Sequence, residues 1–264
     1  MTGYFIFLGR TLPCYGVMIA LGVLVSGAAG AVLVRRHRLV FDNFLLLYAY
    51  CFLFGMAGAK LLYLCLNIKY IDWERLLELE YLNQLMQGGF VFYGGLAGGV
   101  LGLLLGAKLH KIRIKEYLLT VVPVIPMVHG FGRIGCYLAG CCYGVPYDGP
   151  FAVTYRNIPY SLCDVPLFPV QLAEAVCNLI LAAVLFVFVW KKGKTIYTVF
   201  LYLGVYGTVR FILEFFRFDD AQRGIFWGLS TSQWISLGIL AGVTAVLLIM
   251  RRRNVKTGKI SEKL

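Results

Sequence analysis

Long apolar stretches recur from one end of the chain to the other, and short segments between them hold most of the charged residues. A helix needs about 20 apolar residues to cross the hydrocarbon core of a bilayer. Segments of about this length occupy residues 14–34, 44–67, 89–107, 117–139, 171–190, 196–216 and 233–250. The pattern therefore predicts an all-α integral membrane protein with about seven transmembrane helices, and we expect a single polytopic domain over residues 1–264.

The composition also indicates a membrane protein. Of the 264 residues, 60% are hydrophobic and 14% are charged, whereas a soluble domain is about half apolar and about a quarter charged. No charged segment followed by a short apolar core and a small-residue cleavage site opens the chain. We therefore expect the first apolar stretch to remain as a membrane helix. The sequence shows no inverted repeat of the kind that many transporters carry, which disfavours a small-solute transporter or channel.

Lysine and arginine gather in alternate connecting segments, and this alternation predicts an orientation. The clusters lie at residues 35–38, 108–115, 191–194 and 251–263, after the first, third, fifth and seventh predicted helices. Because positively charged segments stay in the cytoplasm, we expect the N-terminus outside and the C-terminus in the cytoplasm. The expected location is a bacterial plasma (inner) membrane. Anionic lipid headgroups account for the net charge of +12, so no nucleic-acid partner is expected.

A few ionisable side chains fall inside the predicted membrane helices, where charge is costly and usually functional. These residues are Lys60, His129, Arg133, Glu174, Arg210 and Glu214. Arg210 and Glu214 are four residues apart and share a helix face. A guanidinium group holds phosphate through two parallel hydrogen bonds, and a phospholipid headgroup is the nearest abundant phosphate in a membrane. The set favours a polar lipid-headgroup site over ion pairs that serve only to hold helices together.

Several other residues are open to two interpretations. His129, one turn before Arg133, is either a general base or a structural histidine. Lys60 either contributes to the site or extends toward the membrane surface. The glycine run that contains Gly94 and Gly95 allows close helix packing or the approach of a ligand, and packing is favoured. The tyrosines Tyr15, Tyr93 and Tyr206 are candidate hydrogen-bond donors, although tyrosine is also common at membrane interfaces.

The eight cysteines do not predict a disulfide framework. Cys51, Cys65 and Cys177 lie in apolar helices and are interpreted as small buried hydrophobic residues. Cys141 and Cys142 are adjacent, but no second close pair with the spacing of a zinc site accompanies them. The sequence therefore predicts no metal site.

The residues around Arg133 resemble a known family signature. Gly132-Arg133-Ile134-Gly135, followed by Gly140 and Tyr143-Gly144, resembles the pattern G-R-x-G-N-F-x-N-G-E-x-x-G of the prolipoprotein diacylglyceryl transferase family. Further matching segments follow in the same order as in that family: Tyr15-Gly16, Gly94-Gly95-Leu96, Phe168-Pro169-Val170-Gln171-Leu172-Ala173-Glu174, Tyr206-Gly207, Arg210-Phe211, Glu214-Phe215-Phe216-Arg217, Asp220-Ala221-Gln222 and Ser232-Gln233. The expected seven-helix topology is also similar to that of the family.

This resemblance implies an enzyme that transfers the diacylglyceryl group of phosphatidylglycerol to the lipobox cysteine in the signal peptide of a prolipoprotein. A thioether forms and glycerol phosphate leaves, without a cofactor. The residues expected to be catalytic are Arg133, Arg210, Glu214, Glu174 and His129. The residues expected to bind substrate or membrane lipid are Tyr15, Lys60, Tyr93, Gly94, Gly95, Cys136, Gly144 and Tyr206.

The chain departs from the family pattern at polar positions. Tyr93 replaces the histidine of the family's H-G-G, Cys136 replaces the asparagine after G-R-x-G, and Cys141 replaces the glutamate of N-G-E. These changes suggest a divergent member. One alternative is therefore a phospholipid-binding or transport protein without catalytic activity, and another is a transferase that uses a different thiol acceptor. Three interpretations are open for Cys136, Cys141 and Cys142. They are packing residues, or they include a redox-sensitive pair, or they carry the lipid transiently, and packing is favoured.

Overall fold

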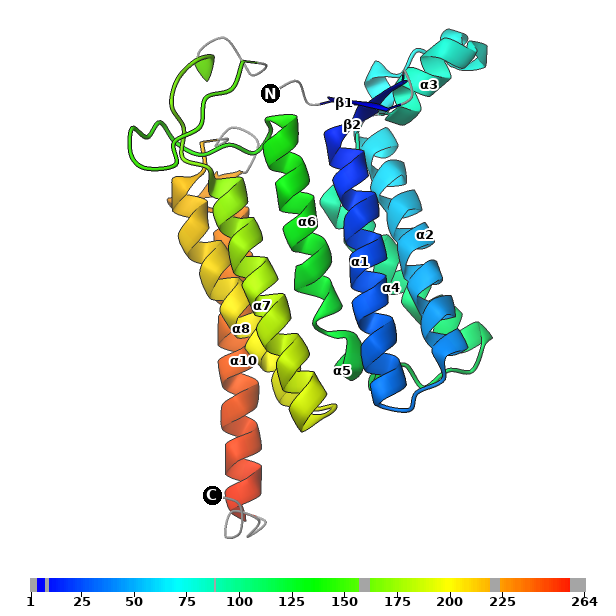
Figure 1. Ribbon diagram of the computed structural model, residues 1–264, viewed down its shortest axis with the longest axis vertical. Helices are drawn as coiled ribbons and strands as arrows, with labels where there is room; N and C mark the ends of the chain where they lie inside the picture. The colour runs from blue at the N-terminus through cyan, green and yellow to red at the C-terminus, as the bar shows by residue number, and fades with distance from the viewer. Residues whose placement is uncertain (1–3, 8–9, 88, 157–161, 219–223, 257–264) are drawn as a thin grey trace. The chain divides into compact units, whose positions relative to one another are not determined.

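The computed structural model describes residues 4–7, 10–87, 89–156, 162–218 and 224–256. Most of this chain is helical (Figure 1). The longest helices are α1 (Cys14–Arg36), α2 (Phe41–Leu66), α4 (Phe92–Leu109), α6 (Val124–Ala139), α7 (Val170–Lys192), α8 (Ile196–Leu213) and α10 (Thr231–Lys256). Shorter helices are η1 (Ile68–Tyr70), η2 (Glu74–Leu77), α3 (Leu79–Gln87), α5 (Ile114–Val121) and η4 (Glu214–Phe216). The strands β1 (Tyr4–Phe7) and β2 (Arg10–Pro13) pair antiparallel, as do β3 (Ile225–Phe226) and β4 (Leu229–Ser230).

Six helices in the described residues are long and apolar enough to cross a membrane, and a seventh span results if α5 and α6 count as one. The prediction of an all-α membrane protein is therefore confirmed. The fourth expected span, residues 117–139, differs from a straight helix because α5 and α6 meet at a bend of 52°. Pro123 lies in the break and precedes the first residue of α6. Proline lacks the amide hydrogen that a continuous helix would need there, so the break has a direct cause.

The described chain divides into two compact units, Val34–Leu118 and the remainder. In the first of these, α2 packs along α4 with its backbone in close contact (Figure 1). A Cβ atom added at Gly58 would collide with the carbonyl oxygen of Gly94, and one added at Gly98 would collide with that of Phe54. The glycines of α4 therefore serve helix packing in this unit, as small residues do in membrane helix pairs. The predicted single domain stays a prediction.

Substituting Gly58 with alanine should destabilise the α2–α4 pair. The new methyl group would meet the Gly94 carbonyl and the Gly98 Cα, and such overpacking costs about 1–3 kcal/mol. Unfolding of the purified protein in micelles, followed by circular dichroism during denaturant titration, measures this loss. The matched control is Gly204→Ala on α8, where an added Cβ would have no heavy atom within 4 Å. Equal unfolding midpoints for the two variants would contradict the packing role of Gly58.

In the other unit, α7 packs against both α6 and α8, and α8 packs against α10 (Figure 1). One face of α7 is buried along its whole length, and it changes from polar to apolar along the helix. Its residues are Glu174, Asn178, Leu181, Leu185 and Val189. This spacing of three or four residues is that of one helical face. The buried polar half of this face lies at the N-terminal end of α7, where the site described below is built.

The segment between α6 and α7 is irregular but well packed. Tyr155 and Leu167 are buried in one apolar cluster with Leu162. Leu167 pairs with both Pro146 and Val153 in isolated β-bridges. This packing fixes the residues that follow α6 against the start of α7.

Candidate active site

A close approach of α6 to α7 places two of the predicted site residues near a third. A Cβ atom added at Gly130 would lie 2.8 Å from Cγ of Leu179 and 3.3 Å from the Ala175 carbonyl oxygen. Glycine therefore permits this approach at the centre of the contact. His129 and Arg133 are four residues apart on α6, so they share the face that meets Glu174 on α7.

The Glu174 carboxylate is the centre of the resulting network. Its Oε2 atom lies 3.1 Å from Nε of Arg133 and 3.3 Å from Nη1 of Arg210, and its Oε1 atom lies 3.4 Å from Nε2 of His129. Two helices, α6 and α8, thus supply three ionisable groups that meet at one buried carboxylate of α7. These four residues were predicted as site residues from their position in apolar segments, and the structure brings them together.

Arg210 extends the network to the fifth predicted residue, Glu214. Its Nη2 atom lies 2.8 Å from Oε2 of Glu214 and donates a hydrogen bond to Oγ of Ser232 at 3.1 Å. The Arg210 guanidinium therefore connects the two buried carboxylates. A planar group with several N–H donors in a fixed fork suits this geometry better than a lysine ammonium group would.

Residues at the junction of β4 and α10 support Glu214, and the sequence patterns did not assign them to the site. Ser230 donates a hydrogen bond from Oγ to Oε1 of Glu214 at 2.9 Å. The Gln233 side-chain oxygen in turn accepts a hydrogen bond from the Ser230 backbone amide at 2.9 Å. Ser232-Gln233 matched the family pattern, and this match was the available signal. Serine and glutamine at the end of a membrane helix are otherwise too common to indicate a site.

In this network the negatively charged side chains are more deeply buried than the two arginines that contact them. The Glu174 and Glu214 side chains expose 2% and 1% of their surface, whereas those of Arg133 and Arg210 expose 14% and 11%. The two arginine side chains are therefore more accessible than the carboxylates that they contact. Arg217, which is also buried, acts electrostatically on Glu174 and adds a third positive charge to the two negative ones. The site is thus suited to an anion.

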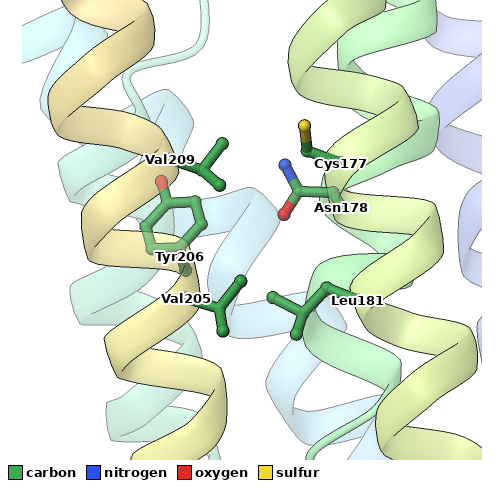
Figure 2. Close-up of a pocket in the computed structure, with 6 residues that line it drawn as sticks. All are labelled: Cys177, Asn178, Leu181, Val205, Tyr206 and Val209. Carbon is green, nitrogen blue, oxygen red and sulfur yellow. The ribbon is translucent and has the colours of Figure 1, made fainter.

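Tyr206 completes the wall of the network on α8. Its ring packs against the imidazole of His129, with ring centroids 5.3 Å apart. Tyr206 also lines a small cavity of about 10 Å³ between α7 and α8, opposite Asn178 (Figure 2). This volume is about enough for one water molecule. The cavity is therefore too small for a phospholipid headgroup, and it is not the substrate site.

Three further predicted residues lie in the same unit as the network. Tyr15 on α1 packs against α6, because a Cβ atom added at Gly135 would lie 3.1 Å from Cδ2 of Tyr15. Cys136 lies one turn beyond Arg133 on α6. Gly144 forms a β-bridge with Arg217, and a Cβ atom there would collide with the Phe168 carbonyl. Gly144 is therefore required by packing.

The remaining predicted residues belong to the other compact unit. Lys60 is buried and donates a hydrogen bond to the carbonyl oxygen of Leu85, which differs from the extended surface position considered above. Its ammonium group also lies 5.3 Å from the ring centroid of Phe90. Gly94 and Gly95 pack against α2, and Tyr93 is exposed. A role of these residues in substrate binding stays a prediction.

The network combines two functions that phosphate-ester chemistry requires. The partly exposed side chains of Arg133 and Arg210 can hold a phosphate and stabilise the charge that develops on a departing one. The imidazole of His129, next to a carboxylate, can accept a proton from a thiol or hydroxyl group.

Comparison with known proteins identifies the group to which this arrangement belongs. The family model described as prolipoprotein diacylglyceryl transferase matches residues 4–250. The chain belongs to this family. The resemblance inferred from the sequence motifs is thereby confirmed.

Relatives named phosphatidylglycerol–prolipoprotein diacylglyceryl transferase match over nearly the full chain. The protein of Clostridium tetani is 37% identical over 87% of this chain and 89% of its own length. A second such protein, from Clostridium perfringens, is 32% identical over 89% of each chain. The protein of Mannheimia succiniciproducens is 32% identical over 92% of this chain and 91% of its own. The family segment Asp220-Ala221-Gln222 lies outside the described residues.

Proposed function

We propose that this protein transfers the diacylglyceryl group of phosphatidylglycerol to the thiol of a lipobox cysteine in a prolipoprotein. The observation that carries the proposal is the pair of partly exposed arginine side chains, Arg133 and Arg210, whose guanidinium groups are held on one buried carboxylate. The names and coverage of the relatives support the same activity. Both substrates are amphiphilic, which fits a chain with six or seven apolar membrane-spanning helices.

The reaction is a substitution at the glycerol carbon that carries the phosphate. The thiol loses its proton to a base, the sulfur forms a bond to this carbon, and the bond between the carbon and the phosphate oxygen breaks. The diacylglyceryl thioether and glycerol phosphate are the products. The Arg133 and Arg210 side chains would bind the phosphate before the reaction and stabilise its growing negative charge as it leaves. A dry, low-dielectric surrounding strengthens this effect.

The candidate base is His129, positioned by Glu174. A thiol has a pKa of about 8.5 and must become a thiolate to act as a nucleophile. The Glu174 carboxylate, 3.4 Å from Nε2 of His129, favours the tautomer that carries its proton on Nε2. Nδ1 is then the nitrogen that accepts the thiol proton. Glu214 would serve to orient Arg210, because its carboxylate already contacts Arg210 and Ser230.

We also propose the location and orientation that the charge pattern predicts. The protein would lie in the bacterial inner membrane with its C-terminus in the cytoplasm, because the connecting segments rich in lysine and arginine stay on that side. A fluorescent protein fused to the C-terminus and active only in the cytoplasm tests this orientation. A dark but fully expressed fusion would contradict it.

Reconstitution in liposomes tests the activity directly. The purified protein is mixed with phosphatidylglycerol liposomes and a peptide that carries a lipobox cysteine, and the peptide is analysed by mass spectrometry. We expect a diacylglyceryl thioether on the cysteine and release of glycerol phosphate. The peptide with serine in place of the cysteine is the matched control and should remain unmodified.

Other outcomes would separate the alternatives. Phosphatidylglycerol that binds but stays intact, with an unmodified peptide, would indicate a lipid-binding protein without catalytic activity. Turnover of the lipid without modification of the peptide would indicate a different thiol acceptor. Either outcome would contradict the proposed reaction, and each would do so in a distinguishable way.

A further inference from the structure

Three cysteine thiols gather at the C-terminal end of α6. The Sγ atoms of Cys136, Cys141 and Cys142 all lie within 4.8 Å of one another, and all three cysteines are free. Cys136 belongs to the last turns of α6, while the other two follow the helix. Sequence spacing alone showed one adjacent pair, so the third thiol joins the cluster through the path of the backbone.

Two left-handed residues produce this path. Gly140 ends α6 with φ 69° and ψ 32°, and its backbone amide bonds back to the last turn of the helix. Cys142 has φ 58°, a conformation that residues other than glycine seldom adopt. The amide of Cys141 between them donates a hydrogen bond to the Cys136 carbonyl oxygen at 3.1 Å. The chain therefore turns back over the helix end, and it places both following thiols beside Cys136.

Neighbouring elements hold the turn in place. The Gln171 side chain on α7 is buried, and it donates a hydrogen bond from Nε2 to the Cys141 carbonyl oxygen at 2.8 Å. The amide of Phe218 donates a hydrogen bond to the Tyr143 carbonyl oxygen at 3.3 Å. Strained backbone that its surroundings hold in this way is typical of functional sites. The cluster is thus preorganised by contacts with α7 and with the segment after η4.

Two positive charges lie near the cluster. The Arg133 and Arg217 guanidinium groups act electrostatically on Cys142. Thiolate is the form that binds metal ions. The two arginines also offset the negative charge that three thiolates around one monovalent cation would leave.

A disulfide accounts less well for the cluster than a metal ion does. Consecutive Cα atoms are about 3.8 Å apart, which is shorter than the 4.4–6.8 Å that a disulfide usually spans, so an adjacent Cys141–Cys142 bond is disfavoured. Any other single disulfide uses two thiols and leaves the third without a role. An ion at about 2.3 Å from each sulfur separates the sulfurs by about 4 Å in a trigonal arrangement. This separation agrees with the observed limit of 4.8 Å.

We propose that Cys136, Cys141 and Cys142 form a trigonal thiolate site for one soft metal ion of the Cu(I) class. Soft thiolate ligands select Cu(I) and zinc among common metals. Zinc prefers four ligands, whereas the cluster found among the described residues supplies three. A three-coordinate monovalent ion therefore fits best.

The test is a titration of the purified full-length protein in micelles with Cu(I) under anaerobic, reducing conditions, in competition with a chromophoric Cu(I) chelator. We expect one equivalent to bind. Cys142→Ser and Cys141→Ser should each weaken binding by at least about 100-fold, because loss of a ligand should exceed the 10–100-fold cost of losing an outer-shell partner. The matched control is Cys163→Ser, whose thiol lies outside the cluster and bonds to the Arg156 carbonyl oxygen. This control should bind Cu(I) as the wild type does.

Two measurements on the wild type avoid reliance on variants that fold poorly. X-ray absorption should give three sulfur neighbours at about 2.3 Å. Bound Cu(I) should also protect Cys136, Cys141 and Cys142, but not Cys163, from iodoacetamide, as mapped by mass spectrometry. Absence of stoichiometric binding, coordination by two sulfurs, or equal protection of Cys163 would each overturn the proposal. A disulfide within the cluster in protein kept under reducing conditions would also overturn it.

Discussion

Arg210→Ala should lower the rate of thioether formation by about 100- to 1,000-fold, the range observed when one preorganised donor to a developing anion is removed. Arg210 contacts both buried carboxylates, and its side chain stays partly exposed. Its removal takes away positive charge where the phosphate would leave. Arg210→Lys keeps the charge but loses the planar fork, so it should recover part of the rate but not all of it.

The liposome assay measures this effect, with the rate normalised to the amount of inserted protein. The matched control is Arg75→Ala, which removes an arginine whose ion pair with Glu78 is exposed and lies outside the network. This control should retain the wild-type rate. Full activity of Arg210→Ala at normal expression would remove the proposed role of Arg210 in phosphate binding.

Glu174→Gln should have the largest combined effect on stability and activity. Glu174 is the carboxylate shared by Arg133, Arg210 and His129. Neutralising it leaves buried guanidinium groups without their common anion, and breaking a buried ion pair in this way costs about 3–5 kcal/mol. The arginines should also lose their fixed positions, so thioether formation should fall below detection.

Denaturant titration in micelles measures the loss of unfolding free energy, and the liposome assay measures the loss of rate. Glu78→Gln serves as the control, because it removes a carboxylate from an exposed pair and should leave the unfolding midpoint unchanged. A Glu174→Gln variant with wild-type stability would show that the network does not hold α6, α7 and α8 together. A stable variant with full activity would contradict both of its proposed roles.

Much of the site could be predicted because charge inside a membrane helix is conspicuous. His129, Arg133, Glu174 and Arg210 interrupt apolar segments, and the cost of burying each charge predicts that they meet. The apolar lengths likewise predicted the long helices. The bend between α5 and α6, at Pro123, could not be predicted in the same way. A proline can bend a membrane helix or be accommodated in it, depending on which neighbouring groups bond to the carbonyl groups that it frees.

Other features could not be predicted, because they depend on contacts between segments or on turns of the backbone that the sequence pattern does not show. Ser230 joins the site through a hydrogen bond to Glu214, although a serine before a helix usually serves as a cap. Lys60 is buried because α3 presents the Leu85 carbonyl to it. The cysteine cluster depends on left-handed backbone at Gly140 and Cys142, and a cysteine in that conformation is not predictable from spacing.

The partial exposure of the Arg133 and Arg210 side chains has a consequence for turnover. The guanidinium groups that bind the phosphate of the lipid would also bind glycerol phosphate after the bond has broken, because its charge is at least as large. Departure of this product, rather than chemistry, would then limit the rate of successive cycles, as in many enzymes that hold their substrates tightly. Rapid-mixing experiments should accordingly show a first cycle that is faster than those that follow, whereas a linear time course from the start would indicate that the arginines release the product freely.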